Sequence, residues 1–288
     1  MKDVTVGIKA FIRTAELDAA LASLAGKGFA QVVVADDSHM DDARRALYAR
    51  HADRLPLRVL ELPFDSGLSY GRNRLVEACA TPYFLLMDDD MELTGDLGLL
   101  RRVLDSDPAL GGAAGMWADH VGGPAYSNTG NLFVFDRCVV QDIGFARRAG
   151  RVERPGVPPY HVTDMITNLA LFDMRVFDDA LWDPAYKITR EHEDFYLTHK
   201  ARGRWKFATV PDFVCVHRPP SASAQASGYR AYRTRDETRA RADAHFRAKW
   251  NKPDGLVWGL PLKPKRFSKA QHLRHVQLAL NPVFRFFK

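Results

Sequence analysis

The chain has 288 residues, of which 46% are hydrophobic, so it can form a buried core in one large domain or two small ones. Its three cysteines are widely spaced and odd in number, which predicts neither a disulfide framework nor a zinc site and fits a reducing, cytoplasmic compartment. The formal net charge of +6 indicates an anionic partner: a nucleotide, a lipid head group, an acidic glycan or a nucleic acid. Neither a signal peptide nor a membrane-spanning run is expected, because the pattern enters a strand at once.

The first part of the chain alternates between short apolar runs and amphipathic or polar segments. Strands are predicted at residues 4–12, 31–35, 57–62 and 82–87, and helices at 14–25, 41–51 and 69–79. Val and Ile are abundant in the apolar runs, as is typical of strands, and Gly26 ends the first helix. Strands that alternate with helices predict a mostly parallel sheet with right-handed crossovers.

The second part of the chain is less regular. Strands are predicted at residues 111–117, 131–135, 168–173 and 210–217, and helices at 191–201 and 229–249. Residues 147–160 are rich in Gly, Pro and Arg and predict a mobile loop that closes over a bound ligand. Residues 219–228 predict a Pro/Ser/Ala connection, and the tail from residue 263 onward is basic and aromatic.

The predicted fourth strand ends abruptly in Asp88-Asp89-Asp90. Open α/β sheets bind ligands at the carboxyl ends of their strands, so these carboxylates are candidates for a site. Asp88 and Asp90 are two residues apart and would face the same side of an extended chain. Two close carboxylates repel each other unless a cation lies between them, which predicts Mg²⁺ or Mn²⁺. The alternative is a solvated loop whose aspartates cap a helix.

Three further segments carry polar side chains at element ends. Asp36 and Asp37 follow the second strand and could accept the N3–H of a uracil or a ribose hydroxyl; the alternative is an N-cap for the next helix. Residues 67–73 open a helix whose N-terminus favours an anion, and Arg72 could contact a phosphate. His217 ends the last strand and is either a structural histidine or a metal ligand.

The third acidic cluster is Glu191-His192-Glu193-Asp194. Such a cluster could supply the carboxylate that removes a proton from a hydroxyl group. The alternative is the acidic enrichment that the helix dipole favours in a first turn.

Taken in chain order, these motifs resemble GT-A glycosyltransferases of the family 2 type. The closest resemblance is to β-1,4-N-acetylgalactosaminyltransferases, and it covers residues 4–218. It is carried by residues 8–13, 35–38, 62–69, 71–73, 84–90, 191–195 and His217. The resemblance implies an α/β, Rossmann-like GT-A fold with a mostly parallel sheet flanked by helices. Residues 1–92 would form the nucleotide-sugar half, residues 93–218 the acceptor half, and residues 219–288 a helical, basic C-terminal extension.

The resemblance also implies an inverting enzyme that moves a hexose or N-acetylhexosamine from a UDP-sugar to a glycan or glycolipid hydroxyl. The cofactor would be Mn²⁺ or Mg²⁺, and its ligands Asp90, His217 and Asp88. Nucleotide contacts would come from Asp36, Asp37, Arg72, Asp88 and Asp89. Asp194 would be the base, with Glu193 and Glu191 as alternates. Trp182 could stack on an acceptor sugar or pack in the core, and His192 would also contact the acceptor.

Two other classes share some of these features: a nucleotidyltransferase with the same nucleotide half, and an inactive, membrane-associated binding module. No nucleic-acid partner is expected, and the pattern favours no oligomeric state. Residues 266–280 have apolar side chains at three- and four-residue steps with basic residues between them. This pattern predicts either a helix at the inner face of the cytoplasmic membrane or a helix that docks on the catalytic domain or a second subunit.

Overall fold

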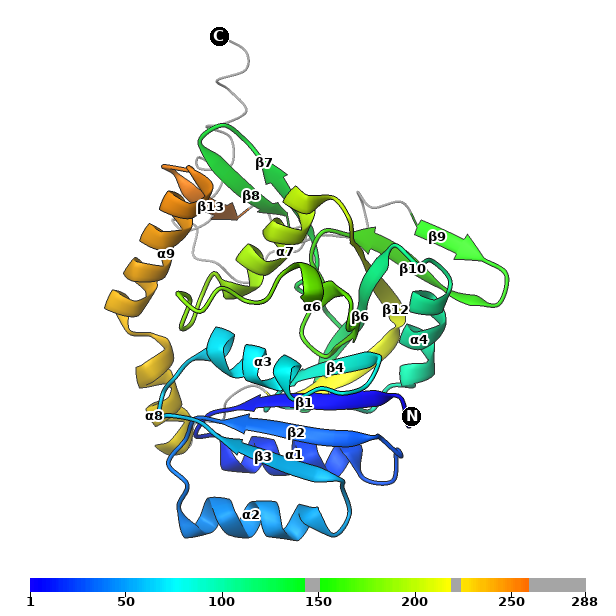
Figure 1. Cartoon of the computed structure of the whole chain (residues 1–288), viewed down its shortest axis with the longest axis vertical. Helices are drawn as coiled ribbons and strands as arrows, with labels where there is room; N and C mark the ends of the chain where they lie inside the picture. Colours follow the sequence, from blue (N-terminus) through cyan, green and yellow to red (C-terminus); the bar gives the residue numbers. More distant parts are fainter. Residues whose placement is uncertain (143–150, 219–223, 259–288) are drawn as a thin grey trace.

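The computed structural model describes residues 1–142, 151–218 and 224–258, in which a mixed ten-stranded sheet is flanked by helices and joined by a small three-stranded sheet (Figure 1). This confirms the predicted α/β class. The described strands are β1 (Val4–Ala10), β2 (Gln31–Asp36), β3 (Leu57–Glu61), β4 (Tyr83–Asp88), β5 (Met91–Glu92), β6 (Leu110–Asp119), β7 (Asn131–Val134), β8 (Cys138–Asp142), β9 (Arg151–Arg154), β10 (Val157–Thr163), β11 (Ala170–Asp173), β12 (Lys206–His217) and β13 (Gly255–Trp258). The described helices are α1 (Thr14–Leu24), α2 (Asp42–Ala52), α3 (Leu68–Glu77), α4 (Leu97–Asp105), α6 (Val176–Asp179), α7 (Glu191–Arg202), α8 (Ala224–Arg233) and α9 (Asp236–Trp250).

The first half of the large sheet has the order β3-β2-β1-β4, and all of its pairs are parallel. All seven residues of β1 are buried, as expected for a strand covered on both faces. Helices α1 and α2 pack on one face of the sheet through Leu17, Leu21 and Leu47. Helix α3 packs on the other face through Leu75 and Val76. The carboxyl ends of β1, β2 and β4 therefore meet at one edge of the sheet.

The second half of the sheet is mixed. Strand β11 lies antiparallel between β4 and β6, and β12 runs parallel to β6. Residues 151–160 belong to the β9–β10 hairpin, so the predicted mobile loop is wrong there, and residues 147–150 lie outside the described part of the chain. Gly156, at φ +74°, lies in the turn of this hairpin. Pro158 and Pro159 coincide with a register shift between Val157 and Tyr160.

The predicted helix at 229–249 is divided into α8 and α9, which break at Thr234 and Arg235. Asp236 and Glu237 begin α9, where the helix dipole favours acidic side chains. Helix α9 buries Phe246 in the same core as Phe195 of α7. The described part of the predicted C-terminal extension thus packs on the rest of the chain. Residues 266–280, for which an amphipathic helix is predicted, lie outside the described residues. Within the described ranges, no helix is both long and apolar enough to cross a bilayer.

Candidate active site

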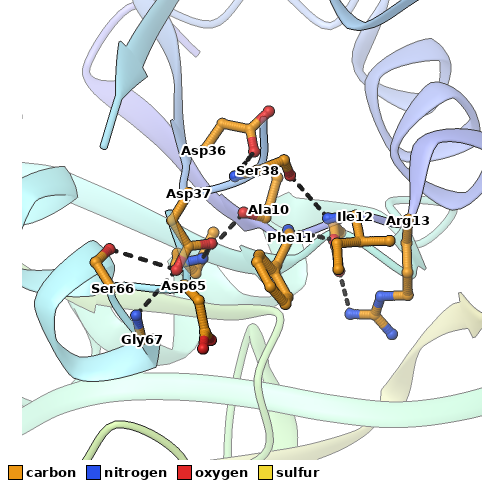
Figure 2. A network of polar contacts seen from close by, with 12 residues as sticks. Ala10, Phe11, Ile12, Arg13, Asp36, Asp37, Ser38, Asp65, Ser66 and Gly67 are labelled. Atoms are coloured by element: carbon orange, nitrogen blue, oxygen red, sulfur yellow. Dashed lines mark hydrogen bonds and ion pairs between the residues drawn. The ribbon is translucent and has the colours of Figure 1, made fainter. Parts of the chain in front are cut away.

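The loop after β1 lies at the carboxyl edge of the sheet, beside α8 (Figure 1). Ile12 in this loop has a φ of 64°, which is unfavourable for a β-branched residue. Its N–H donates a 2.8 Å hydrogen bond to Ser38 Oγ, which joins the loop to the end of β2 (Figure 2). Leu169 and Arg190, which precede β11 and α7, also have positive φ values. Backbone strain of this kind is common at functional sites, where the surrounding structure maintains it.

Asp36 and Asp37 have different surroundings although they are adjacent (Figure 2). Asp36 is fully buried, accepts a 2.7 Å bond from Arg44 Nε and is also bonded by Tyr48. Burial raises the pKa of Asp36, but the charge and hydrogen bonds of Arg44 outweigh it and hold that pKa below its ordinary value. The carboxylate of Asp36 fastens α2 to β2, and the nucleotide contact predicted for Asp36 stays a prediction.

Asp37 points to the other side, toward the N-terminus of α3. It accepts a 2.9 Å bond from Gly67 N and forms an ion pair with Lys9. Gly67 has a φ of 101°, and a Cβ there would lie 2.8 Å from the carbonyl oxygen of Lys187, so only glycine fits. Asp37 lines a pocket together with Lys9, Phe11, Asp65, Tyr232 and Arg233.

Aromatic rings from distant segments form the walls of this pocket. The ring of Phe11 lies 5.3 Å from Tyr232 of α8 and 5.6 Å from Phe64, measured between centroids. Asp65, on the same loop as Phe64, is held by Lys187 Nζ at 2.7 Å and by Arg235 at 3.4 Å. The pocket thus combines flat apolar walls with carboxylate oxygens, which is the composition that suits a nucleobase.

Asp88 is connected to Glu191 through Arg72. Asp88 Oδ1 lies 3.2 Å from Arg72 Nη2, its Oδ2 accepts a 2.6 Å bond from Asn168, and Arg72 Nη1 lies 3.5 Å from Glu191 Oε1. Arg72 is 1% exposed, and the phosphate contact predicted for it stays a prediction. It positions two carboxylates that are far apart in the sequence. Glu191 Oε2 is buried and has no hydrogen-bond partner within the described part of the chain.

Asp89 and Asp90 share Arg13, whose guanidinium forms an ion pair with each of them. Strand β4 ends at Asp88 and the chain then turns, so the alternation that would place Asp88 beside Asp90 does not continue, and that prediction is wrong. Asp89 is 1% exposed and also accepts a 3.0 Å bond from Phe11 N. The carboxylate of Asp89 fastens the loop after β1, and its predicted nucleotide contact stays a prediction.

His217 is close to Asp90, as predicted, with 3.5 Å between Nε2 and Asp90 Oδ2. Its Nδ1 lies 3.1 Å from Asp119 and 2.8 Å from the hydroxyl of Tyr126. Burial lowers the pKa of His217, but the two carboxylates outweigh burial and raise it above its ordinary value. Among the residues that the structure describes, no group of three His, Cys, Asp or Glu side chains is arranged to hold a metal ion.

The acidic first turn of α7 sends its carboxylates in different directions. Asp194 is 1% exposed and is bonded by Lys249 Nζ and Trp250 Nε1, both at 2.8 Å, from α9. Glu193 is paired with Arg190 at 3.9 Å, and burial raises the pKa of Glu193. Glu191, in contrast, contacts Arg72.

The two predicted acceptor residues also differ. Burial and the charge of Arg72 lower the pKa of His192 to about 4, so its imidazole is neutral at neutral pH. Trp182 is 2% exposed, and its ring stacks on Phe195 at 4.5 Å between centroids. Trp182 therefore packs in the core, which is one of its two predicted roles, and stacking on an acceptor sugar stays a prediction.

The family model described as "Glycosyl transferase family 2" matches residues 5–181, which is more than half of the chain. The chain belongs to glycosyl transferase family 2. The match and the α/β architecture confirm the predicted GT-A fold. The predicted resemblance to β-1,4-N-acetylgalactosaminyltransferases stays a prediction, and no curated protein sequence matches the chain.

Solved structures support the same fold at low sequence identity. TarS from S. aureus has a TM-score of 0.55 and 14% identity, and the match covers 99% of this chain but 44% of TarS, so this chain spans less than half of that protein. TarS 1–349 in complex with UDP-GlcNAc also has a TM-score of 0.55 and 14% identity, with 99% and 73% covered. The mannosyltransferase PcManGT from Pyrobaculum calidifontis, in complex with GDP-Man and Mn²⁺, has a TM-score of 0.53 and 16% sequence identity. This match covers 87% of this chain and 67% of PcManGT.

This family 2 chain also has site residues that the sequence analysis did not single out. They are Arg13, Asp65, Asn168, Tyr229 and Tyr232, which lie in loops at the carboxyl edge of the sheet or on α8. The position of Arg13 directly after the first predicted strand is a signal that could have identified it, since residues at that place face the ligand edge of the sheet.

Proposed function

We propose that this protein is an inverting glycosyltransferase that transfers a hexose or N-acetylhexosamine from a UDP-sugar to a hydroxyl group of a glycan or glycolipid. The observation that carries the proposal is the link from Asp88 through Arg72 to Glu191, with distances of 3.2 Å and 3.5 Å, at the same sheet edge as the Asp37 pocket. A donor site and a candidate base are thus adjacent, as a direct displacement requires. TarS 1–349, which was solved with UDP-GlcNAc, supports the choice of a UDP-sugar.

The uracil would occupy the pocket that Phe11 and Tyr232 line. Asp37 and Asp65 line this pocket and provide the acceptor oxygens that a uracil N3–H requires. Lys9 and Arg233 also line it and would face the diphosphate, whose negative charge increases as UDP leaves. Helix α8 would therefore complete the donor site, although it follows the segment that the family model matches.

We propose Glu191, rather than Asp194, as the base. Glu191 Oε2 has no partner, so it can accept the acceptor's hydroxyl proton while Arg72 holds the other carboxylate oxygen. The acceptor oxygen would then attack the anomeric carbon from the side opposite to the leaving UDP, which inverts the configuration. Asp194 would support α7 from behind, and the neutral His192 would accept a hydrogen bond from the acceptor sugar.

The predicted use of Mn²⁺ or Mg²⁺ has mixed support. The PcManGT structure contains Mn²⁺, which favours a metal in this fold. In this chain the Asp90 oxygen that faces His217 is the one that Arg13 binds, and Asp88 is directed to Arg72 and Asn168 instead. The predicted ligands, as arranged here, do not fit a divalent cation, and the steps described above use none.

The proposal is tested by adding UDP-GlcNAc, UDP-GalNAc, UDP-glucose or UDP-galactose to the protein. GDP-mannose, which carries guanine in place of uracil, is the control for recognition of the nucleobase. Saturation-transfer NMR should show contacts from the uracil and sugar protons of at least one UDP-sugar, and UDP should be released in its presence. Release of a sugar 1-phosphate, which requires attack at the phosphorus atom bound to the uridine, would identify a nucleotidyltransferase. Binding without any turnover, with acceptor glycans present, would identify an inactive binding module.

A further inference from the structure

Arg13 occupies a buried position between two carboxylates. Its side chain is 8% exposed, and its two terminal nitrogens pair with Asp89 Oδ1 and Asp90 Oδ2. The ring of Tyr229 from α8 covers the guanidinium, with 4.2 Å from Cζ to the ring centroid. Arg13 is therefore enclosed by the turn after β4 on one side and by α8 on the other.

The backbone around Arg13 maintains this position. Ile12 has a strained φ of 64° and is held by Ser38, while Phe11 N donates to the second oxygen of Asp89 at 3.0 Å. The loop after β1 and the aspartate turn are thus joined by both backbone and side-chain contacts. A strained conformation is maintained only where its surroundings fix it. The contacts of Ile12 and Phe11 therefore hold the loop, and with it Arg13, in one position.

The contacts of Arg13 involve the groups that a divalent cation would need. Arg13 Nη1 binds Asp90 Oδ2, and His217 Nε2 lies 3.5 Å from the same oxygen. The other ring nitrogen of His217 faces Asp119 at 3.1 Å, so both nitrogens are directed at carboxylates. Each carboxylate of the Asp89–Asp90 pair already has a cationic partner, which removes the repulsion that predicted a metal from the sequence.

Arg13 also has capacity for a further contact. Its Nε is buried and has no hydrogen-bond partner among the residues that the structure describes, although a guanidinium can donate five hydrogen bonds. Unlike a metal ion, a guanidinium stays attached and stays charged, and its planar arrangement of donors suits phosphate oxygens. Lys9 and Arg233 line the adjacent pocket and add to the positive charge there.

Building on the proposed donor site, we propose that Arg13 takes the place of a divalent metal: it neutralises Asp89 and Asp90 permanently, so that UDP binds and leaves without Mn²⁺ or Mg²⁺. The aspartate turn then has a positioning role, because it fixes Arg13 beside the diphosphate. This assignment differs from the expectation that the triplet is a metal site.

Two measurements on the full-length protein test this inference. The first is a titration of MnCl₂ followed by the EPR signal of free Mn²⁺, with no nucleotide present. The second is calorimetric titration of UDP, once in excess EDTA and once in MnCl₂. The variants are Arg13→Gln, which removes the charge, Arg13→Lys, which keeps it, and Arg45→Gln, which changes an arginine that is 59% exposed in its side chain and serves as the control.

The inference predicts that wild-type protein and Arg45→Gln bind no stoichiometric Mn²⁺ and bind UDP equally well in EDTA and in MnCl₂. Arg13→Gln should acquire Mn²⁺ binding, because Asp89, Asp90 and His217 lose their competing cation. It should also bind UDP in EDTA ~10-fold or more weakly, the usual effect of losing a charge-assisted hydrogen bond. Arg13→Lys should remain independent of Mn²⁺.

Stoichiometric Mn²⁺ binding by the wild type, or UDP binding that requires Mn²⁺, would overturn the inference and identify Arg13 as a side chain that the metal displaces. If Arg13→Gln does not fold, the wild-type titrations and Arg13→Lys still decide between these outcomes. The manganese titration does not depend on the nucleotide. A wild-type protein that binds no UDP under either condition would therefore contradict the proposed function separately.

Discussion

The acidic turn after β4 and the acidic first turn of α7 resemble each other in sequence, yet their carboxylates have different surroundings. After β4, Asp89 and Asp90 are both paired with Arg13. In α7, Asp194 is paired with Lys249 of α9, whereas Glu191 contacts Arg72 and keeps one oxygen without a partner. The comparison indicates that cations from distant segments decide which carboxylate of a cluster is available for chemistry.

The largest expected effect follows from removing Arg72, which connects the two regions. Arg72→Met leaves Asp88 and Glu191 without their shared cation, so the free energy of unfolding should fall by ~3–5 kcal/mol, the usual cost of breaking a buried ion pair. Chemical denaturation measures this change. Arg74→Met is the control, because Arg74 lies on the same helix with a 46% exposed side chain. Equal stability of the two variants would show that the link contributes nothing.

Asp194→Asn separates a structural carboxylate from a catalytic one. Asp194 is buried with three hydrogen-bond donors, so its loss should lower the free energy of unfolding by ~1–3 kcal/mol. Denaturation of this variant is compared with that of Glu237→Gln, whose native carboxylate is 86% exposed and should be dispensable. A fully stable Asp194→Asn would contradict the role of Asp194 in joining α7 to α9.

The same comparison applies to the two neighbouring aspartates at the end of β2. Asp37→Asn should weaken UDP binding by ~10-fold, because the pocket loses one carboxylate of the proposed uracil site. Asp36→Asn should leave the UDP affinity of the folded protein unchanged and instead lower its melting temperature, because Asp36 anchors Arg44 and Tyr48. Calorimetric UDP titrations and melting curves of both variants would show the reverse pattern if the assignment is wrong.

A smaller effect concerns His199, on the buried side of α7. It is fully buried, neither ring nitrogen has a partner, and burial lowers the pKa of His199 from 6.5 to about 4. Between these pH values the unfolded chain binds a proton that the folded protein does not, so stability falls as the pH is lowered, by at most ~1.4 kcal/mol per pH unit for this group. His199→Phe should reduce this slope in denaturation curves between pH 6.5 and pH 4. The exposed His120→Phe should not, and an unchanged slope in both would contradict the account.

Much of the first half of the fold could be predicted from the sequence, because its signals are local. Strands β1, β2 and β4 are buried apolar runs, and the turns between the first elements contain capping residues and glycines. Helix α4 and the short strands β8 and β13 were not predicted; β8 and β13 pair with each other across more than a hundred residues, which no local pattern reveals. The α8–α9 break was missed because the charged pattern of 229–249 is continuous.

The site could be located but not fully assigned. Apolar strands that end in carboxylates indicated the edge of the sheet at which the structure brings these side chains together, and Asp37 and Glu191 were among the candidates. What the sequence did not reveal is the partner of each carboxylate, since Arg13 is 77 residues from Asp90 and Arg72 is 119 residues from Glu191. The difference between Asp36 and Asp37 likewise depends on Arg44 and Lys9, which lie on different elements.

The most direct test of the account is the rate of UDP release from a bound UDP-sugar, measured with acceptor for Glu191→Gln and Asp194→Asn together with the UDP affinity of each. The account predicts that Glu191→Gln lowers turnover by ~10²–10⁴, the usual contribution of a general base, with UDP affinity unchanged. Asp194→Asn should keep a turnover close to the wild type per folded molecule. A large loss of turnover in Asp194→Asn, together with nearly normal turnover in Glu191→Gln, would contradict the account and identify Asp194 as the general base.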